Sequence, residues 1–238
     1  MNIEYLLSCD HTVRCLKKAG IETVEQLQKL SEKDLLGIRG VGKVISRDVL
    51  AAMETYEVHR LFILARLDQE TSSYCHHLSE QIIDRPIPGY SLYPHITLAT
   101  LDVPNVDLFV SRSAVLFEKM NAFPIYFAEA AFYPQIASVS ILPEKKGSLM
   151  IAFEKATKVQ PECLTSYYDA GPKVYLPHLT LVHDGHLCEE ELMESRKKIQ
   201  KLFHPFTGQV TEIDYSLLKA ENQFEIVHQV KLGGSDVC

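Results

Sequence analysis

Several features are missing from the 238-residue sequence. It has no apolar run of eighteen residues and no basic start followed by an apolar stretch, so neither a transmembrane helix nor a secretory signal is expected. The six cysteines show no C-x-x-C spacing, which argues against a zinc site and fits a reducing compartment. We therefore expect a cytoplasmic protein with no membrane partner and no need for disulfides.

Basic residues are also in short supply. There are 24 Lys and Arg against 31 Asp and Glu, which gives a formal net charge of -7. Proteins that coat duplex nucleic acid neutralise many phosphates, so this balance counts against such a role. A small phosphate ligand or an RNA end held at a local site remains compatible with it.

Residues 1–56 have the pattern of a small all-α unit. Leucine and valine recur at helical spacing through CLKKAGIETVEQLQKLSEKDLLGI, and no segment alternates like a strand. Thr23 stands three residues before Gln26, and Ser31 stands three before Asp34, which are spacings typical of helix N-terminal capping boxes. The pattern predicts short helices joined by tight turns.

Two glycines, Gly40 and Gly42, separate two helical patterns in LLGIRGVGKVISRDVLAAM. This stretch resembles a helix-hairpin-helix motif, and LKKAGIETVEQLQKLSEKDLLGIRGVGK is similar to the C-terminal domain of the bacterial RNA polymerase alpha subunit. The resemblance implies that the glycine hairpin presents backbone N–H groups to nucleic-acid phosphates, assisted by Lys43 and Arg47. Acidic and basic residues are equal in number over 1–56, so docking of a protein partner stays open.

Strand and helix patterns are mixed from residue 57 onward, which predicts an α+β domain over 57–238. The expected strands and helices are, in order, RLFILARL, the helical SSYCHHLSEQIIDR, YPHITLAT, the helical PNVDLFVSRSAVLFEKM, FPIYFAEAAFYP, ASVSILP, SLMIAFE, KVYLPHLTLVHD, the helical EEELMESRKKIQKL, and strands from FTGQV to VKLG.

A short repeat lies inside this domain. PHITL at 94–98 returns as PHLTL at 177–181, and each copy is followed by a helical segment and a strand. Such self-similarity predicts a duplicated unit whose copies face each other across a pseudo-twofold axis. A single His-x-Thr on a strand is more often scaffold than catalyst. Two copies predict that both pairs meet in one cleft, because His and Thr two residues apart share a strand face.

The two tetrads His95-Ile96-Thr97-Leu98 and His178-Leu179-Thr180-Leu181 resemble the signature of the 2H (two-histidine) phosphoesterase superfamily, which includes the 2′-5′ RNA ligase and RNA 2′,3′-cyclic phosphodiesterase group. The resemblance covers about 57–238. It implies a bilobal, duplicated β-α-β fold with two antiparallel sheets flanking a central cleft. The helical addition at the N-terminus is absent from the simplest members.

The resemblance further implies a phosphodiesterase that needs neither metal nor cofactor and opens RNA terminal 2′,3′-cyclic phosphates to 2′-phosphates. Imidazoles can take or give a proton near neutral pH. His95 would be the proton donor and His178 the proton acceptor, while Thr97 and Thr180 would hold the phosphate oxygens. We expect RNA ends or short oligonucleotides as partners and a monomeric protein.

Three alternatives remain open at this point. The same site would suit 2′-5′-linked oligonucleotides or 3′ trimming of RNA, and a protein of another class would bind a nucleotide or RNA without turnover.

Tyr93 and Tyr175 lie beside the tetrads, where they would either stack on a base or pack the core.

Three further polar clusters fit structural roles better than chemical ones. We interpret His183-Asp184-Gly185-His186 as a polar turn rather than a set of metal ligands, and His76-His77 as helix surface. Lys145-Lys146-Gly147 is typical of a solvated hairpin turn.

Overall fold

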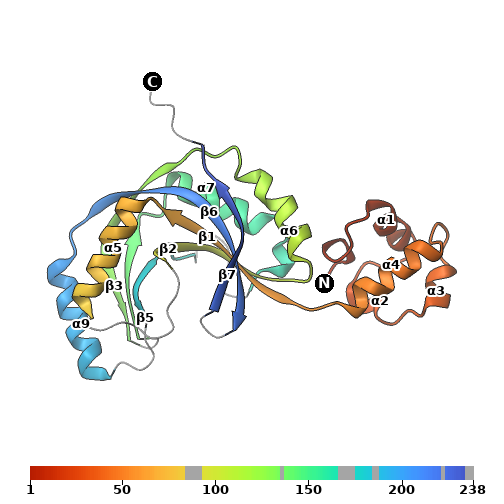
Figure 1. Ribbon diagram of the computed structural model, residues 1–238, viewed down its shortest axis with the longest axis horizontal. Helices are drawn as coiled ribbons and strands as arrows, with labels where there is room; N and C mark the ends of the chain where they lie inside the picture. Colours follow the sequence, from red (N-terminus) through yellow and green to blue (C-terminus); the bar gives the residue numbers. More distant parts are fainter. Residues whose placement is uncertain (84–92, 135–136, 166–174, 184–187, 221–222, 234–238) are drawn as a thin grey trace.

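The computed structural model describes residues 1–83, 93–134, 137–165, 175–183, 188–220 and 223–233. Within these ranges no helix is long and apolar enough to cross a membrane. Helices gather at one end of the molecule, and a curled sheet with its own helices forms the rest (Figure 1).

The first 56 residues fold as the short helices that the sequence predicts. They are η1 (Ile3–Tyr5), α1 (Asp10–Lys18), α2 (Val24–Leu27), α3 (Glu32–Leu36) and α4 (Lys43–Glu54). The capping boxes at Thr23 and Ser31 are both formed, because each side chain accepts from the backbone N–H three residues on. Apolar faces of the helices meet around Leu16, Leu35 and Val49, so this helical unit has a hydrophobic core of its own.

Two copies of a β-α-β-α-β unit make up the remainder, as the repeat in the sequence predicts. The first copy contains β1 (His59–Leu67), α5 (Gln69–Ile82), β2 (His95–Val103), α6 (Val106–Ser113), η2 (Ala114–Leu116) and β3 (Phe123–Tyr133). The second contains β4 (Ser138–Pro143), α7 (Gly147–Lys158), η4 (Pro161–Cys163), β5 (Leu179–His183), α9 (Glu189–Leu202) and β6 (Phe206–Ala220), and β7 (Gln223–Lys231) follows it. Each tetrad lies at the start of the middle strand of its copy.

The strands form one antiparallel sheet, so the prediction of two separate sheets flanking a cleft is wrong. Their order is β2-β1-β6-β3-β4-β5, and β7 pairs with β6. β6 is 15 residues long, and this length joins the two copies. Its residues 206–210 pair with β3, whereas 210–217 pair with β1. The two end strands, β2 and β5, contact each other, so the sheet is curled.

Helices are exchanged between the copies. α5 of the first copy packs on β5 of the second, and α7 of the second packs on β2 of the first. The hydroxyl of Ser79 on α5 donates to the carbonyl oxygen of Leu181 at 2.5 Å. Each tetrad strand is therefore held by a helix from the other copy, and neither copy can form the arrangement alone.

One segment expected as a strand, SLMIAFE, is the helix α7. Its buried residues Leu149, Ala152, Phe153 and Ala156 follow helical spacing. The preceding Lys145-Lys146-Gly147 consequently joins a strand to a helix and is not the predicted hairpin turn, with φ of +57° at Gly147.

The two remaining polar clusters have different outcomes. His76 and His77 lie on the exposed surface of α5 beside Glu80, as predicted. His183 ends β5, and positions 184–186 lie outside the described residues.

The helical unit is fastened to the sheet domain through its first residues. Tyr5 is 7% exposed, packs into the core of the sheet domain, and donates its hydroxyl to a carboxylate oxygen of Glu162 at 2.5 Å. Arg112 of α6 donates to the carbonyl oxygen of Glu4 at 2.8 Å, and Asn105 donates to that of Leu6 at 3.2 Å. Burial, with the neighbouring Glu162, raises the pKa of Tyr5 well above its usual range. The two parts are thus in fixed contact.

Replacing Tyr5 tests this attachment. Hydrogen bonds to charged groups contribute about 1.5–3 kcal/mol, and since Glu162 is shared with Asn2, we expect Tyr5→Phe to lower the free energy of unfolding by about 1–2 kcal/mol. Protease cleavage between α4 and β1 should also become faster. Urea unfolding and limited proteolysis measure the two effects. Wild-type behaviour in both would contradict the attachment.

Candidate active site on two meeting strands

Both tetrads show the predicted alternation. On β2, Ile96 and Leu98 are fully buried, whereas His95 and Thr97 are partly exposed. The second tetrad repeats this pattern, with its two leucines buried and its His and Thr partly exposed. In an extended strand successive side chains point to opposite faces, so each His shares a face with its Thr.

The two imidazoles are held in the same way. His95 Nδ1 lies 2.7 Å from the carbonyl oxygen of Tyr93, and His178 Nδ1 lies 3.0 Å from that of Leu176, which in each case is two residues earlier. A carbonyl oxygen only accepts hydrogen bonds, so Nδ1 carries the hydrogen in both rings. Nε2 of each ring has no hydrogen-bond partner among the residues that the structure describes, and it is the nitrogen available for chemistry.

The tetrads lie near each other because β2 and β5 are in contact. The hydroxyl of Tyr175, three residues before His178, donates to the carbonyl oxygen of Thr97 at 2.8 Å. His178 also contributes to lowering the pKa of His95. The two tetrads, from distant parts of the sequence, thus lie on strands that contact each other.

Burial lowers the pKa of His95 below its ordinary value, and the nearby His178 lowers it further. The hydrogen bond to the Tyr93 carbonyl and the negative charge of Asp214 act in the opposite direction. Because the lowering effects prevail, His95 loses its proton more readily than an exposed histidine.

A charged cluster that the sequence reasoning missed surrounds His95. Arg66 of β1 pairs with His95 on one side and with Glu212 of β6 on the other, so the three share a sheet face. Arg66 donates to Glu212 at 3.2 Å and lies 3.5 Å from Asp214, and its guanidinium is 4.1 Å from the centre of the Tyr93 ring. The signal for this cluster was the alternation in EIDYS, which places two carboxylates on one strand face.

The surroundings of His178 are different. Thr180 pairs with Ser140 of β4, whose hydroxyl lies 3.3 Å from that of Ser138, and the ring of Tyr133 is 6.4 Å from the His178 ring. Leu176, whose carbonyl holds His178, is 53% exposed. The named neighbours of the second tetrad are therefore neutral, whereas those of the first include three charged groups.

Residues 9–55 match the family described as the C-terminal domain of the alpha subunit of bacterial RNA polymerase. The resemblance predicted for this part of the sequence is confirmed. These residues are called the polymerase-alpha-like unit below.

The fold is similar to that of solved phosphoesterase structures. E. coli LigT in apo form is 17% identical with a TM-score of 0.45, and E. coli LigT complexed with 3'-AMP is 16% identical with a TM-score of 0.47; each match spans 74% of this protein and 99% of the other. Kluyveromyces marxianus Usb1 with uridine monophosphate is 12% identical with a TM-score of 0.41, over 75% and 100%. At these identities the likeness concerns the fold.

The two tyrosines named from the sequence have different surroundings. Tyr175 is 2% exposed, its ring stacks on Phe153 at 3.9 Å, and its hydroxyl is bonded to the first tetrad, which favours the packing alternative. Tyr93 is partly exposed, and its hydroxyl donates to Asp214. Tyr93 thus remains beside the candidate site, while Tyr175 ties the two tetrad strands together.

The polymerase-alpha-like unit presents the glycine hairpin at its surface. Gly40 has φ of +92°, and a Cβ atom there would lie 2.8 Å from Sγ of Cys15, so only glycine fits. Gly42 is the N-cap of α4, and Lys43 and Arg47, four residues apart on one helix face, are exposed. The four residues named from the sequence therefore lie together.

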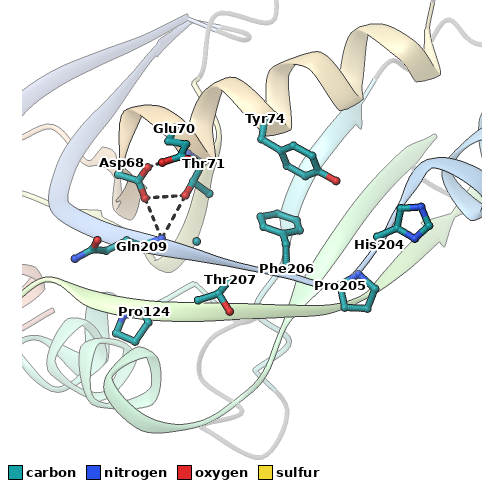
Figure 2. A pocket seen from close by; sticks show the side chains of 11 residues that line it. Asp68, Glu70, Thr71, Tyr74, Pro124, His204, Pro205, Phe206, Thr207 and Gln209 are labelled. Atoms are coloured by element: carbon teal, nitrogen blue, oxygen red, sulfur yellow. Dashed lines mark hydrogen bonds between the residues drawn. The ribbon is translucent and has the colours of Figure 1, made fainter.

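A separate groove of about 670 Å³ lies between the start of α5 and the start of β6, and Figure 2 shows the side chains that line it. Tyr74 and Phe206 meet edge to face with ring centres 4.7 Å apart. Asp68 caps α5 and also accepts from the backbone N–H of Gln209 at 3.0 Å. No tetrad residue lines this groove, and the half-buried carboxylate of Asp68 is used in local structure.

The environment of His95 predicts a measurable titration. We expect an NMR pH titration of its ring protons to give a pKa below the ordinary value of about 6.5. The unfolded protein then binds a proton that the folded protein does not, so the free energy of unfolding should fall as the pH drops through about 6.5. His95→Gln should reduce this fall in urea unfolding. A His95 midpoint at or above 6.5 would contradict the described environment.

Proposed function

We propose that the protein is a phosphodiesterase that opens RNA terminal 2′,3′-cyclic phosphates by paired-histidine acid–base catalysis. The observation that carries the proposal is the meeting of two strands, each with a histidine anchored through Nδ1 to a carbonyl two residues earlier and a threonine two residues later. This arrangement supplies two reactive Nε2 atoms and two hydroxyls for one phosphate.

The reaction needs a proton taken from water and a proton given to the leaving oxygen. Nε2 of neutral His178 removes a proton from water as the water oxygen bonds to phosphorus. Nε2–H of protonated His95 gives its proton to O3′ as the P–O3′ bond breaks, which leaves a 2′-phosphate. The hydroxyls of Thr97 and Thr180 donate to the non-bridging oxygens as negative charge redistributes. The two histidines then exchange protonation states with solvent before the next turnover.

Single substitutions test these assignments. Because general acid–base catalysis contributes about 10²–10⁴-fold, His95→Ala and His178→Ala should each lower kcat by that amount on a nucleoside 2′,3′-cyclic phosphate in EDTA. His76→Ala, at an exposed histidine of α5, is the matched control and should keep wild-type turnover. Unimpaired turnover in both tetrad variants would reject the mechanism.

The pH dependence of kcat/KM tests which histidine gives the proton. If His95 is the donor, kcat/KM should fall above the pKa of His95, so the optimum should lie on the acid side of pH 7. The midpoint of the alkaline side of the kcat/KM profile should coincide with the pKa of His95 measured by NMR. If the midpoint of the acid side coincides with that pKa instead, His95 is the proton acceptor and His178 the donor.

Product analysis separates this substrate from the alternatives. A panel of 2′,3′-cyclic, 2′-5′-linked and 3′-5′-linked oligonucleotides distinguishes end processing from cleavage of 2′-5′ bonds and from 3′ trimming. Tight binding with no product over long incubation would favour a non-catalytic RNA-binding module.

We further propose that the polymerase-alpha-like unit contacts the RNA strand of longer substrates. Lys43 and Arg47 are exposed at the free start of α4, where backbone N–H groups attract phosphate. The contacts of Tyr5 and Glu4, directly before this unit, hold the helical part of the chain against the sheet domain, so a single RNA would meet both parts in a fixed relation.

The double variant Lys43→Ala/Arg47→Ala tests this contact. It should weaken the binding of long RNA and leave mononucleotide turnover unchanged. The slope of the logarithm of the binding constant against the logarithm of the salt concentration should fall by an amount that corresponds to about one to two phosphate contacts. Lys29→Ala/Lys33→Ala removes the same charge from exposed positions elsewhere on the unit and is the control. Equal losses on long and short substrates would point to a structural role instead.

A further inference from the structure

Asp214 is a fully buried carboxylate that the proposed reaction does not use. Burying a charge is costly unless it is paired and hydrogen-bonded. Here Tyr93 donates its hydroxyl to Oδ2, Gln229 of β7 donates to Oδ1 at 2.8 Å, and Nε of Arg66 lies 3.5 Å from Oδ2. Three residues from three parts of the fold thus converge on this carboxylate.

Tyr93 links this cluster to the candidate reaction centre. Its side chain is fixed at two points, because the hydroxyl is bonded to Asp214 and the ring lies 4.1 Å from the guanidinium of Arg66. Its backbone carbonyl accepts the Nδ1–H of His95 at 2.7 Å. The hydroxyl and ring contacts therefore hold the carbonyl that sets both the tautomer and the orientation of the imidazole.

The second copy of the repeat provides an internal comparison. Leu176 occupies the position equivalent to Tyr93, since its carbonyl holds His178 at 3.0 Å. Its isobutyl group has no hydrogen-bond donor and the residue is 53% exposed. Among the residues that the structure describes, no buried carboxylate supports this second histidine–carbonyl contact, so there the contact forms without a cluster like that around Asp214.

We propose that Asp214, acting through Tyr93, is a positioning residue that fixes the direction of Nε2 of His95. Its importance for turnover rests on the proposed function, whereas its effect on the His95 ring does not. The same carboxylate favours the protonated form of His95, whereas His178, directly before β5, acts against it. Arg66 of β1 and Glu212 of β6 are the other charged groups that share this sheet face.

Tyr93→Phe is the most direct test, because it removes one hydroxyl and keeps the ring and the backbone. Side-chain ¹⁵N NMR reports the tautomer of each neutral histidine. In the wild type His95 should be in the Nδ1–H form; in Tyr93→Phe it should become a mixture of tautomers, while His178 stays unchanged. kcat should fall about 10-fold to 10²-fold with little change in KM, because a misdirected ring affects the reaction more than binding.

Asp214→Asn separates charge from position. Because the amide oxygen of asparagine can still accept from the Tyr93 hydroxyl, this variant should lower the pKa of His95 by removing a favourable negative charge and leave the Nδ1–H tautomer of His95 in place. Tyr5→Phe is the matched control, because it removes another tyrosine–carboxylate hydrogen bond, the one to Glu162, away from the tetrads. It should leave the His95 spectrum unchanged.

The outcomes distinguish the two proposals. A wild-type His95 spectrum in folded Tyr93→Phe would overturn the positioning role of Asp214. Suppose instead that Tyr93→Phe shows the expected spectral change but the wild-type protein turns over none of the phosphodiesters in the panel. The positioning role would then stand, and the phosphodiesterase activity would be rejected.

Discussion

The contact between β2 and β5 is the constraint on which the candidate site depends. These are the two end strands of one sheet, and they meet because β6 pairs with both copies of the repeat and the helices α5 and α7 pack on the strand of the opposite copy. The polar edges of the tetrads are brought together by the same packing that buries Ile96, Leu98, Leu179 and Leu181. Stability and site geometry thus come from one set of contacts.

The two tetrads share their histidine–carbonyl contacts but differ in the charged groups that the structure describes around them. Both histidines are anchored to the carbonyl two residues earlier, yet His95 faces Arg66, Glu212 and Asp214, whereas His178 lies beside an exposed leucine and a tyrosine. Burial and the nearby His178 lower the pKa of His95, so the donor role proposed for His95 is best met at acid pH, where this imidazole holds its proton.

Much of the site could be predicted from the sequence, because it depends on local rules. Alternation places His95 with Thr97 on one strand face, the repeat supplies the second pair, and the Thr23 and Ser31 capping boxes mark helix starts. The charged cluster around His95 could not be predicted in this way. It depends on the register between strands that are far apart in the sequence, such as those of Arg66 and Glu212. The single sheet was missed for the same reason. The helix α7 was predicted as a strand because a short apolar run fits both the helical and the strand periodicity.

In the proposed mechanism both tetrads hold one phosphate. Titration of a nucleoside 2′-monophosphate, followed by ¹H–¹³C NMR of the imidazole Cε1 positions, measures this directly. The signals of His95 and His178 should shift together with one dissociation constant, and that of His76 should not respond. A shift of only one tetrad histidine, or different midpoints for the two, would contradict this mechanism.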